Sequence, residues 1–463
     1  MSTLFASLQT ASAALDAFSQ ALGASQTNIS NSSTAGYAAI KATIQPIDLS
    51  GDGSSAGDFV TLSSTGSLRA DALVQTASSQ ASASQTTVAQ LTPVNQLFDI
   101  TGASGILAAL QNFSSAFSSL SVSPNDSTLG AQALTAASGV ASAFQTASSS
   151  LTSQSQQIDS SIQSTTQQIN SLGVDIRQLN SQAAAQTQFN PGIDASIRSD
   201  LDQLSSLVDI TVTQNSDGAV SVLAGGEIPL VIGNQSYALS VDPTAAAGSQ
   251  VSSAAGGTSP ATFSGQLGAL LNTQNSTINT LLGTGTTPGS LNTLASGFAT
   301  QVNALLSSGV TASGAPGGPI FTFDPANAAQ SLSLDATVTP GQLGLATTGN
   351  NASSNGIANQ LAALPSSTAV TDQIGGDSAE GFFSSIAASV GQQLSDAETA
   401  STADQTTLTS AQTTRQQNSG VSLDTEAVNI TTYQRSYEAA AQVVSILDEL
   451  TSDAVHMIDG TSL

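Results

Sequence analysis

Few residues in this sequence have the types and spacing that chemistry requires. Gly53, Ser55 and Gly57 follow the G-x-S-x-G pattern of a hydrolase nucleophile elbow. That pattern needs a strand before it, a helix after it and a histidine as base. Here it lies in the polar run DLSGDGSSAGD, and the one histidine of the chain is the distant His456. A loop is the better interpretation, and a hydrolase built around Ser55 is the enzymatic alternative.

Candidate metal ligands are equally sparse. The run from Asp48 to Gly53 resembles the start of a calcium-binding loop, but the twelfth position, where glutamate is needed, is Phe59. His456 has no second histidine or cysteine to complete a metal site. The acidic residues near it, between positions 448 and 459, are typical of a solvated helix face. The sequence therefore predicts no catalytic residue, no cofactor and no metal.

Charge excludes further classes of partner. The 463 residues include 6 Lys or Arg and 31 Asp or Glu, which gives a net charge of −25 although only 8% of residues are charged. The six cations are scattered singly: Lys41, Arg69, Arg177, Arg198, Arg415 and Arg435. No basic patch could neutralise a run of phosphates or bind an anionic membrane surface. We expect neither nucleic acid nor membrane as a partner.

The chain has no cysteine, so disulfides and thiolate chemistry are excluded. No apolar run approaches the length of a membrane span, which is about 18 residues. The N-terminal residues MSTLFASLQTASAALDAF lack the basic region and the unbroken apolar region of a cleavable signal peptide. If the protein leaves the cytosol, we expect another export route.

The two ends of the chain carry the clearest pattern. At each end, apolar residues recur with the alternating steps of four and three that are typical of a coiled-coil seam. The N-terminal seam contains Leu4, Leu8, Ala11, Leu15, Phe18, Leu22 and Ile29. The C-terminal seam contains Tyr433, Tyr437, Ala440, Val444, Leu447, Ala454 and Ile458. Such narrow helices need partners, either each other in a simple hairpin or neighbouring subunits, and strict seams favour assembly.

The middle of the chain changes period twice. Helical spacing over 138–185 gives way after Val208 to strand-like alternation, with predicted turns at 215–218 and 233–234. A helical stripe returns between Phe382 and Arg415. The predicted fold is mainly α with a β-rich insertion, elongated, with long terminal helices in a helical bundle. We expect five segments: an axial helix and turn (1–45), two bundle parts (46–207 and 346–420), an outer β-rich domain (208–345) and a C-terminal axial helix (421–463).

Both ends also carry a family resemblance. Residues 28–37, NISNSSTAGY, resemble the N-I-S-N-A-x-T-P-G-Y signature of flagellar rod, hook and hook-associated proteins, with Ala35 where the family usually has proline. Residues 419–450 resemble the family's ending, S-G-V-x-L-D-E-E followed by L-x-x-Y-Q-x-x-Y-x-A-A-A-x-V. Interior segments 198–222 and 294–323 are similar to the hook-associated protein 1 branch in particular. The resemblance is collinear over nearly the whole chain.

That resemblance implies a structural, non-enzymatic protein of the bacterial flagellum at the hook–filament junction. It implies export without a cleaved signal peptide, and terminal helices that order as a coiled coil on assembly. The implied partners are further copies in a ring, the hook protein, the neighbouring junction protein and an export chaperone at the C-terminal helix. A second junction protein, a hook protein or a rod protein is the alternative. The expected interface residues are Leu4, Leu8, Leu15, Phe18, Leu22, Asn28, Asn31, Gly36, Tyr37, Tyr433, Gln434, Tyr437, Val444 and Leu447.

Overall fold

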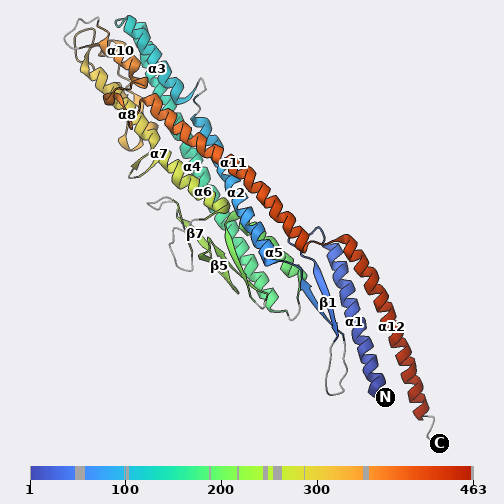
Figure 1. Ribbon diagram of the computed structural model, residues 1–463. Helices are drawn as coiled ribbons and strands as arrows, with labels where there is room; N and C mark the ends of the chain where they lie inside the picture. The colour runs from blue at the N-terminus through green and yellow to red at the C-terminus, as the bar shows by residue number, and fades with distance from the viewer. Residues whose placement is uncertain are drawn as a thin grey trace. The chain divides into compact units, whose positions relative to one another are not determined.

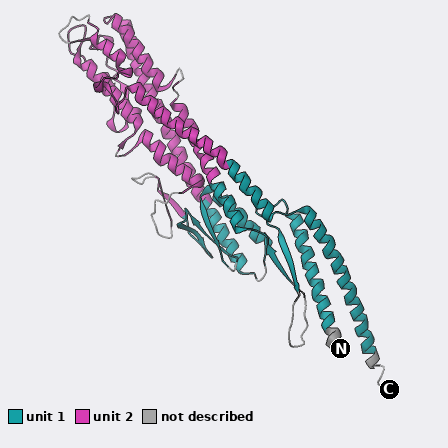
Figure 2. Cartoon of the chain, in the orientation of Figure 1, with its two compact units in different colours: residues 1–79, 169–238, 405–463 teal, residues 80–168, 239–404 magenta. Residues whose placement is uncertain are grey.

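The computed structural model divides the chain into two compact units (Figure 2). Unit 1 contains residues 1–79, 169–238 and 405–463, and unit 2 contains residues 80–168 and 239–404. The structure describes residues 2–46, 58–98, 100, 104–186, 189–215, 218–242, 249–253, 263–285, 287–347 and 354–459. Three helices, α2 (Leu68–Leu97), α4 (Ser127–Ala184) and α11 (Ala379–Ser419), run from one unit into the other.

Unit 1 contains both ends of the chain. Besides parts of the three shared helices it holds α1 (Ser2–Ser30), β1 (Ile40–Pro46), β2 (Asp58–Ser64), α5 (Pro191–Leu207), β3 (Ile210–Gln214), β4 (Val220–Ala224), β5 (Ile228–Ile232), β6 (Gln235–Ser236) and α12 (Leu423–Asp459). Helices α1 and α12 lie side by side (Figure 1). Strands β1 and β2 form an antiparallel hairpin that packs on α1.

Small side chains allow α1 to approach its neighbours closely. The apolar residues of this helix that are most buried are Ala17, Ala21 and Ala24, which recur with the helical steps of four and three. Alternate hairpin residues, such as Ala42, Ile44 and Leu62, are half-buried, whereas Lys41 is exposed. The hairpin therefore covers α1 with one face, as alternation along a strand requires.

The four-stranded antiparallel sheet β3–β4–β5–β6 is hydrogen-bonded to helix α4 through Asn180. The side-chain nitrogen of Asn180 donates to the carbonyl oxygens of Val220 (2.7 Å) and Gly233 (2.8 Å), and its oxygen accepts from Val220 N (2.9 Å). Asn180 is fully buried. Its amide satisfies strand groups that would otherwise lack partners.

Unit 2 is a mostly helical body with short strand pairs. Its elements are α3 (Gly105–Val122), β7 (Leu239–Asp242), β8 (Gln250–Ser253), α6 (Gly265–Asn272), a π-helical segment (Thr273–Ile278), α7 (Asn279–Leu282), β9 (Gly283–Thr284), β10 (Thr287–Pro288), α8 (Ser290–Ser308), β11 (Gly309–Val310), β12 (Phe321–Thr322), α9 (Ala328–Ser331), β13 (Ser333–Leu334), β14 (Ala346–Thr347) and α10 (Gly356–Ala363).

The core of unit 2 is apolar and contains phenylalanines in tilted and edge-to-face contact. Phe113 contacts both Phe117 and Phe298, with ring centroids 4.5 and 5.2 Å apart, and Phe298 also faces Phe321 at 6.4 Å. All of these side chains except that of Phe321 are fully buried, and Phe321 is 2% exposed. Aromatic contacts of this kind add to the free energy gained by burial.

The mainly helical fold with a strand-containing middle region, predicted from the sequence, is confirmed. Helix α4 covers the predicted helix 138–185 and begins eleven residues earlier, at Ser127. The two predicted turns after Val208 join β3 to β4 and β5 to β6. The region 265–308 is largely helical within the expected β-rich segment, because the buried positions of α8 recur at helical spacing.

The β1–β2 hairpin was not predicted. The sequence indicated only a polar loop across 48–58, and the strands stand on either side of it. The G-x-S-x-G residues and the run from Asp48 to Gly53 lie outside the described residues. The five-segment division remains a prediction, although the boundary between units at 238–239 falls inside its 208–345 segment.

Candidate functional site

The two terminal helices present their predicted seams to different degrees. On α12, Tyr433, Val444 and Leu447 are half-buried, whereas Gln434 and Tyr437 are exposed. On α1, Leu8, Leu15, Phe18 and Leu22 are all half-buried, and the side chain of Leu4 lies outside the described residues. The larger residues of both seams therefore keep part of their apolar surface accessible in the single chain.

A second apolar stripe lies on α12 outside this pairing. We call the residues Ala439, Val443, Ile446 and Leu450 the outer stripe; they recur at steps of four, three and four and are all exposed. The side chains of Val443, Ile446 and Leu450 are 48%, 57% and 50% exposed. A helix that carries two such seams is suited to pack between two partners.

Asn28 joins the end of α1 to the start of α12 and to the hairpin. Its nitrogen donates to the carbonyl oxygen of Ile40 (2.9 Å) and to Glu426 Oε1 (2.8 Å). Its oxygen accepts from Ile40 N (2.7 Å) and from the Tyr37 hydroxyl (2.8 Å). These bonds use the full capacity of a carboxamide. They connect residues 398 positions apart in the chain.

Glu426 also affects the phenol that Asn28 binds. Burial raises the pKa of Tyr37 to about 12, and the nearby charge of Glu426 acts in the same direction. The Tyr37 hydroxyl therefore stays protonated at physiological pH and remains a donor to Asn28. Glu426 itself is buried, 7% exposed, and its Oε2 accepts a longer bond, 3.3 Å, from Asn429.

The turn after α1 depends on its glycine. Asn31 donates from its side chain to Thr27 O (2.9 Å) and accepts from the Thr34 hydroxyl (3.2 Å). Gly36 has φ of +73°, and a Cβ there would come within 2.6 Å of the Ala195 carbonyl oxygen. Only glycine meets both conditions, the left-handed backbone and the close approach to α5.

The break between α11 and α12 is fixed by the root of the hairpin. The Ser419 carbonyl oxygen accepts from Ala39 N at 2.9 Å, and Ala39 O in turn accepts from Thr65 N at 2.8 Å. The Ser422 carbonyl oxygen accepts from Glu426 N at the start of α12. The end of α11 and the hairpin are thus joined through main-chain bonds, whereas the Ser422–Glu426 bond closes the first turn of α12.

Two arginines and three aspartates, which we call the ion-pair cluster, lie beside this break. Arg198 pairs with Asp71, and its Nε lies 3.1 Å from Asp194 Oδ2. Arg415 Nη1 lies 2.8 Å from Asp202 Oδ2 and 3.7 Å from Asp71 Oδ1. The cluster joins α2, α5 and α11. Asp71 lies in the first turn of α2, where the helix dipole favours negative charge.

Burial dominates the electrostatics of this cluster. It raises the pKa of Asp71 and the pKa of Asp202, while the guanidinium groups of Arg198 and Arg415 oppose the increase. With two positive and three negative groups, the cluster carries a net charge of −1 when all five are ionised. A sixth group nearby is therefore more favourable if it is uncharged or positive.

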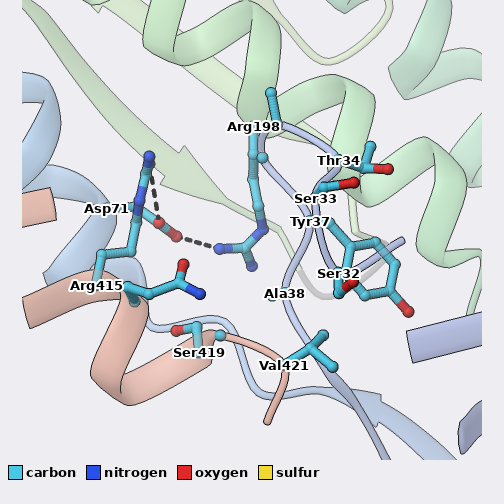
Figure 3. Close-up of a pocket in the computed structure, with 14 residues that line it drawn as sticks. Ser32, Ser33, Thr34, Tyr37, Ala38, Asp71, Arg198, Arg415, Ser419 and Val421 are labelled. Carbon is cyan, nitrogen blue, oxygen red and sulfur yellow. Dashed lines mark hydrogen bonds and ion pairs between the residues drawn. The ribbon is translucent and has the colours of Figure 1, made fainter. Parts of the chain in front are cut away.

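A cavity of about 230 Å³, the terminal cavity, opens between the two signature segments (Figure 3). It is lined by the turn Ser32–Ala38, by Ser419–Val421 with Gln416, and by Asp71, Arg198 and Arg415. The N-terminal and C-terminal motifs, which lie more than 380 positions apart in the sequence, thus meet at one place. Ser32, Ser33 and Thr34 are exposed at its edge.

Four of the expected interface residues lie at the end of α1 and in the turn after it: Asn28, Asn31, Gly36 and Tyr37. The remaining expected residues lie along α1 and α12. The sequence did not reveal Arg198, Arg415 and their aspartates as a cluster, because each stands alone along the chain. The sequence signal that could have revealed the cluster was the aspartates at helix starts and the arginines on helical stripes.

His456 is exposed. Within the described residues, no group of three or more His, Cys, Asp or Glu could hold a metal ion. No helix there is long and apolar enough to cross a membrane.

Two family models match the chain. The model described as the flagellar hook-associated protein FlgK helical domain matches residues 91–321. The model described as the flagellar basal body rod FlgEFG protein C-terminal region matches residues 412–457, which include Ser419 and most of α12.

Individual relatives agree with these matches. The flagellar hook-associated protein 1 of Bacillus subtilis (strain 168) is 28% identical over 182 residues, which is 36% of this chain. That match spans about a third of the relative's own length, 34%. The flagellar hook junction protein FlgK from Burkholderia pseudomallei has a similar fold, with a TM-score of 0.64 over 76% of this chain and all of that one. At 16% sequence identity that likeness concerns the fold alone.

Proposed function

Because the chain belongs to the FlgK family of flagellar hook-associated proteins, we propose that it is a structural subunit of the hook–filament junction. The observation that carries the proposal is the pair of terminal helices, whose apolar seams are only partly covered in the single chain. Apolar surface arranged as an a/d seam gains free energy when a further helix covers it. The role is therefore mechanical and non-enzymatic.

The outer stripe supports assembly with further copies. A simple hairpin of α1 and α12 needs one seam on each helix, yet α12 carries a second one on exposed positions. The exposed residues beside Val443 are the uncharged Gln442 and Ser445, whereas Asp448 and Glu449 are exposed between Ile446 and Leu450, so a helix meets least like-charge repulsion at the Val443 end of the stripe. We therefore assign the outer stripe to contacts with neighbouring subunits in a ring, and the remaining seams to the hook protein and the neighbouring junction protein.

The same stripe suits a cytosolic partner before assembly. An export chaperone that covers Val443, Ile446 and Leu450 would keep them from associating prematurely. In this proposal the protein is exported through the flagellar channel without a cleaved signal peptide and acts outside the cell, at the distal end of the hook.

Hook particles stripped of filament and junction proteins provide the test. The purified chain is added and the distal ends are imaged by electron microscopy. Binding at the tip that is lost on removal of residues 1–30 or 430–463 would support the proposal. Ile446→Asp should abolish tip binding, whereas Val370→Asp in unit 2, at a position 85% exposed, should not.

Other outcomes identify the alternatives. Binding only after a first junction protein has been added would make this chain the second junction protein. No binding in either case would leave the helix pair as a structural part of the single chain. Esterase activity that is lost in Ser55→Ala would instead favour the hydrolase alternative.

A further inference from the structure

We propose that the free chain forms a weak two-fold dimer in which the outer stripes of two α12 helices pack against each other in antiparallel orientation. The inference rests on the proposed function, since it names the partner that the outer stripe takes before assembly. It goes beyond that function because a two-fold contact uses the same surface on both copies and cannot extend into a ring. The dimer therefore withholds the stripe from the junction until the two copies separate.

The spacing of the outer stripe suits an antiparallel partner of the same sequence. Its steps of four, three and four read the same in both chain directions, so a second copy turned end to end meets it residue for residue. This register places Ala439 opposite Leu450 of the second copy and Val443 opposite its Ile446. Each large side chain then faces a smaller one, which fills the space between the helices evenly. A parallel copy in register would instead place alanine opposite alanine and leucine opposite leucine.

The charged residues at the two ends of the stripe favour the same orientation. Arg435 lies four residues before Ala439 and Asp453 lies three residues after Leu450, and both side chains are exposed. None of the ion pairs found in the described structure includes either residue. Antiparallel pairing brings Arg435 of each copy nearly level with Asp453 of the other, which gives two symmetric ion pairs. In a parallel pair Arg435 is level with a second Arg435 and roughly 27 Å along the axis from Asp453.

The stripe lies on an accessible side of α12, beside the side that α1 covers (Figure 1). Its large side chains, those of Val443, Ile446 and Leu450, are 48%, 57% and 50% exposed. Four residues from each copy make a small interface, and interfaces below about 1,200 Å² are typical of transient contacts. We therefore expect a dissociation constant on the order of 10–100 μM. Such a dimer opens readily when another surface competes for the stripe.

Sedimentation equilibrium of the purified chain across the micromolar range tests for the dimer. Ile446→Asp should abolish it, because the substitution places a carboxylate opposite Val443 of the other copy without a partner. Val455→Asp is the matched control, on the same helix at a position 45% exposed. Val455 is five residues from Leu450 and so faces away from the stripe, and its variant should dimerise as the unchanged chain does. A chain that stays monomeric at every concentration would overturn the proposal.

Charge reversal tests the register. Arg435→Asp replaces two attractive pairs by two repulsive ones and should weaken dimerisation about tenfold. Addition of Asp453→Arg to the same chain makes both pairs attractive again and should restore the dissociation constant of the unchanged chain. Weakening by Arg435→Asp that persists in the double variant would show that these two residues do not meet.

Cysteine cross-linking tests the orientation directly, because the chain has no cysteine of its own. Chains that carry Ala439→Cys are mixed with chains that carry Leu450→Cys and are then oxidised. In the antiparallel register the two thiols face each other, so the mixture should form a covalent dimer. Either variant by itself should not, since its two thiols lie roughly 16 Å apart along the axis. A cross-link in either variant alone would indicate a parallel pair and would contradict the proposal.

The disulfide-locked dimer shows whether pairing withholds the stripe from assembly. It should not bind hook tips, with or without a first junction protein, whereas the same sample after reduction should bind as the mixture that was never oxidised does. Equal binding before and after reduction would overturn the inference. None of these failures touches the proposed function, which fails only if the unchanged chain binds hooks in neither condition.

Discussion

Each of the two compact units is stabilised internally by a different kind of interaction. All four ion pairs found in the described structure, those of Arg198 and Arg415, lie in unit 1. All four aromatic contacts found there, which involve Phe98, Phe113 and Phe298, lie in unit 2. Even the cations divide this way, since residues 80–168 and 239–404 contain no lysine or arginine.

This difference shows how a chain with few charged residues can concentrate them in one unit, where they fix the local geometry. Unit 2 is stabilised by burying large apolar side chains, which requires no particular orientation of partners. Unit 1 contains thin terminal helices with small buried residues, so it has less apolar area to bury near the break between α11 and α12. Directional contacts, the Asn28 bonds and the ion-pair cluster, fix the geometry there instead.

Removal of a central ring from unit 2 should have the largest effect. Phe298→Ala takes away a fully buried side chain with two aromatic neighbours and leaves a cavity. We expect a loss of about 3–5 kcal/mol of unfolding free energy, measured by chemical denaturation. Val122→Ala, at a position 82% exposed, is the control and should change it by less than about 0.5 kcal/mol. A small loss for Phe298→Ala would show that unit 2 does not depend on its ring cluster.

Loss of one arginine should be the comparable test for unit 1. Arg198→Ala leaves Asp71 and Asp194 without their partner in a largely buried setting, with side chains 9% and 18% exposed. We expect a loss of about 3 kcal/mol, the lower end for breaking a buried pair, with faster amide exchange in α5 than in α8. Arg69→Ala, at an exposed arginine on α2, is the matched control. Equal protection of α5 in both variants would contradict this view of unit 1.

Acidification should stabilise the cluster modestly. Burial raises the pKa of Asp71 and of Asp202, so the folded chain binds protons at pH values where the unfolded chain does not. The unfolding free energy of unit 1 should therefore increase as pH falls from 7 toward the ordinary aspartate pKa of about 3.9. Amide exchange of α5 measured between pH 7 and pH 5, corrected for the intrinsic rate, reports this change, and Asp71→Asn should reduce it.

Asp335 in unit 2 supplies a control of opposite sign. Hydrogen bonds from the Thr337 main chain and hydroxyl lower the pKa of this exposed carboxyl. Its contribution is lost as pH falls, so Asp335→Asn should remove a small loss of unfolding free energy that acid causes in unit 2. An unchanged loss on acidification in this variant would mean that other groups determine the pH dependence.

Salt should give the smallest effect. Unit 2 carries acidic groups and no lysine or arginine, so added salt screens repulsion only and should stabilise it slightly. In unit 1 the same screening also weakens ion pairs, so its net gain should be smaller. Amide exchange of α8 and α5 at low and high NaCl compares the two units directly. A larger gain in α5 than in α8 would contradict the division between them.

Much of the helical architecture was predictable because it depends on local spacing. The fully buried positions Val140, Phe144, Leu151 and Ile158 of α4 all lie within the helix predicted over 138–185. The role of the buried asparagines was not. In the sequence, Asn28 and Asn180 look like ordinary polar helix residues. Their role is visible only in the structure, where each binds main-chain groups of a strand. Asparagines on the apolar face of a helical stripe were the signal that could have found them.

The buried face of α1 shows the same limit. The sequence pattern identified its leucine seam, but the residues that are buried most deeply are Ala17, Ala21 and Ala24. Alanine has little apolar area, so spacing alone gave it little weight. Its value is in close approach, and that is defined only once the hairpin and α12 are in place.

Features that depend on neighbours along the chain were accessible without the fold. Heptad spacing indicated the terminal helices, alternation indicated β3 to β6, and the scarcity of cations excluded polyanionic partners. The grouping of distant residues into one site emerged from the three-dimensional arrangement alone. Asn28 and Glu426, or Asp71 and Arg415, carry no mutual sequence signal, because a hydrogen bond or ion pair depends on a few ångströms of separation. Folding alone brings such groups within that distance.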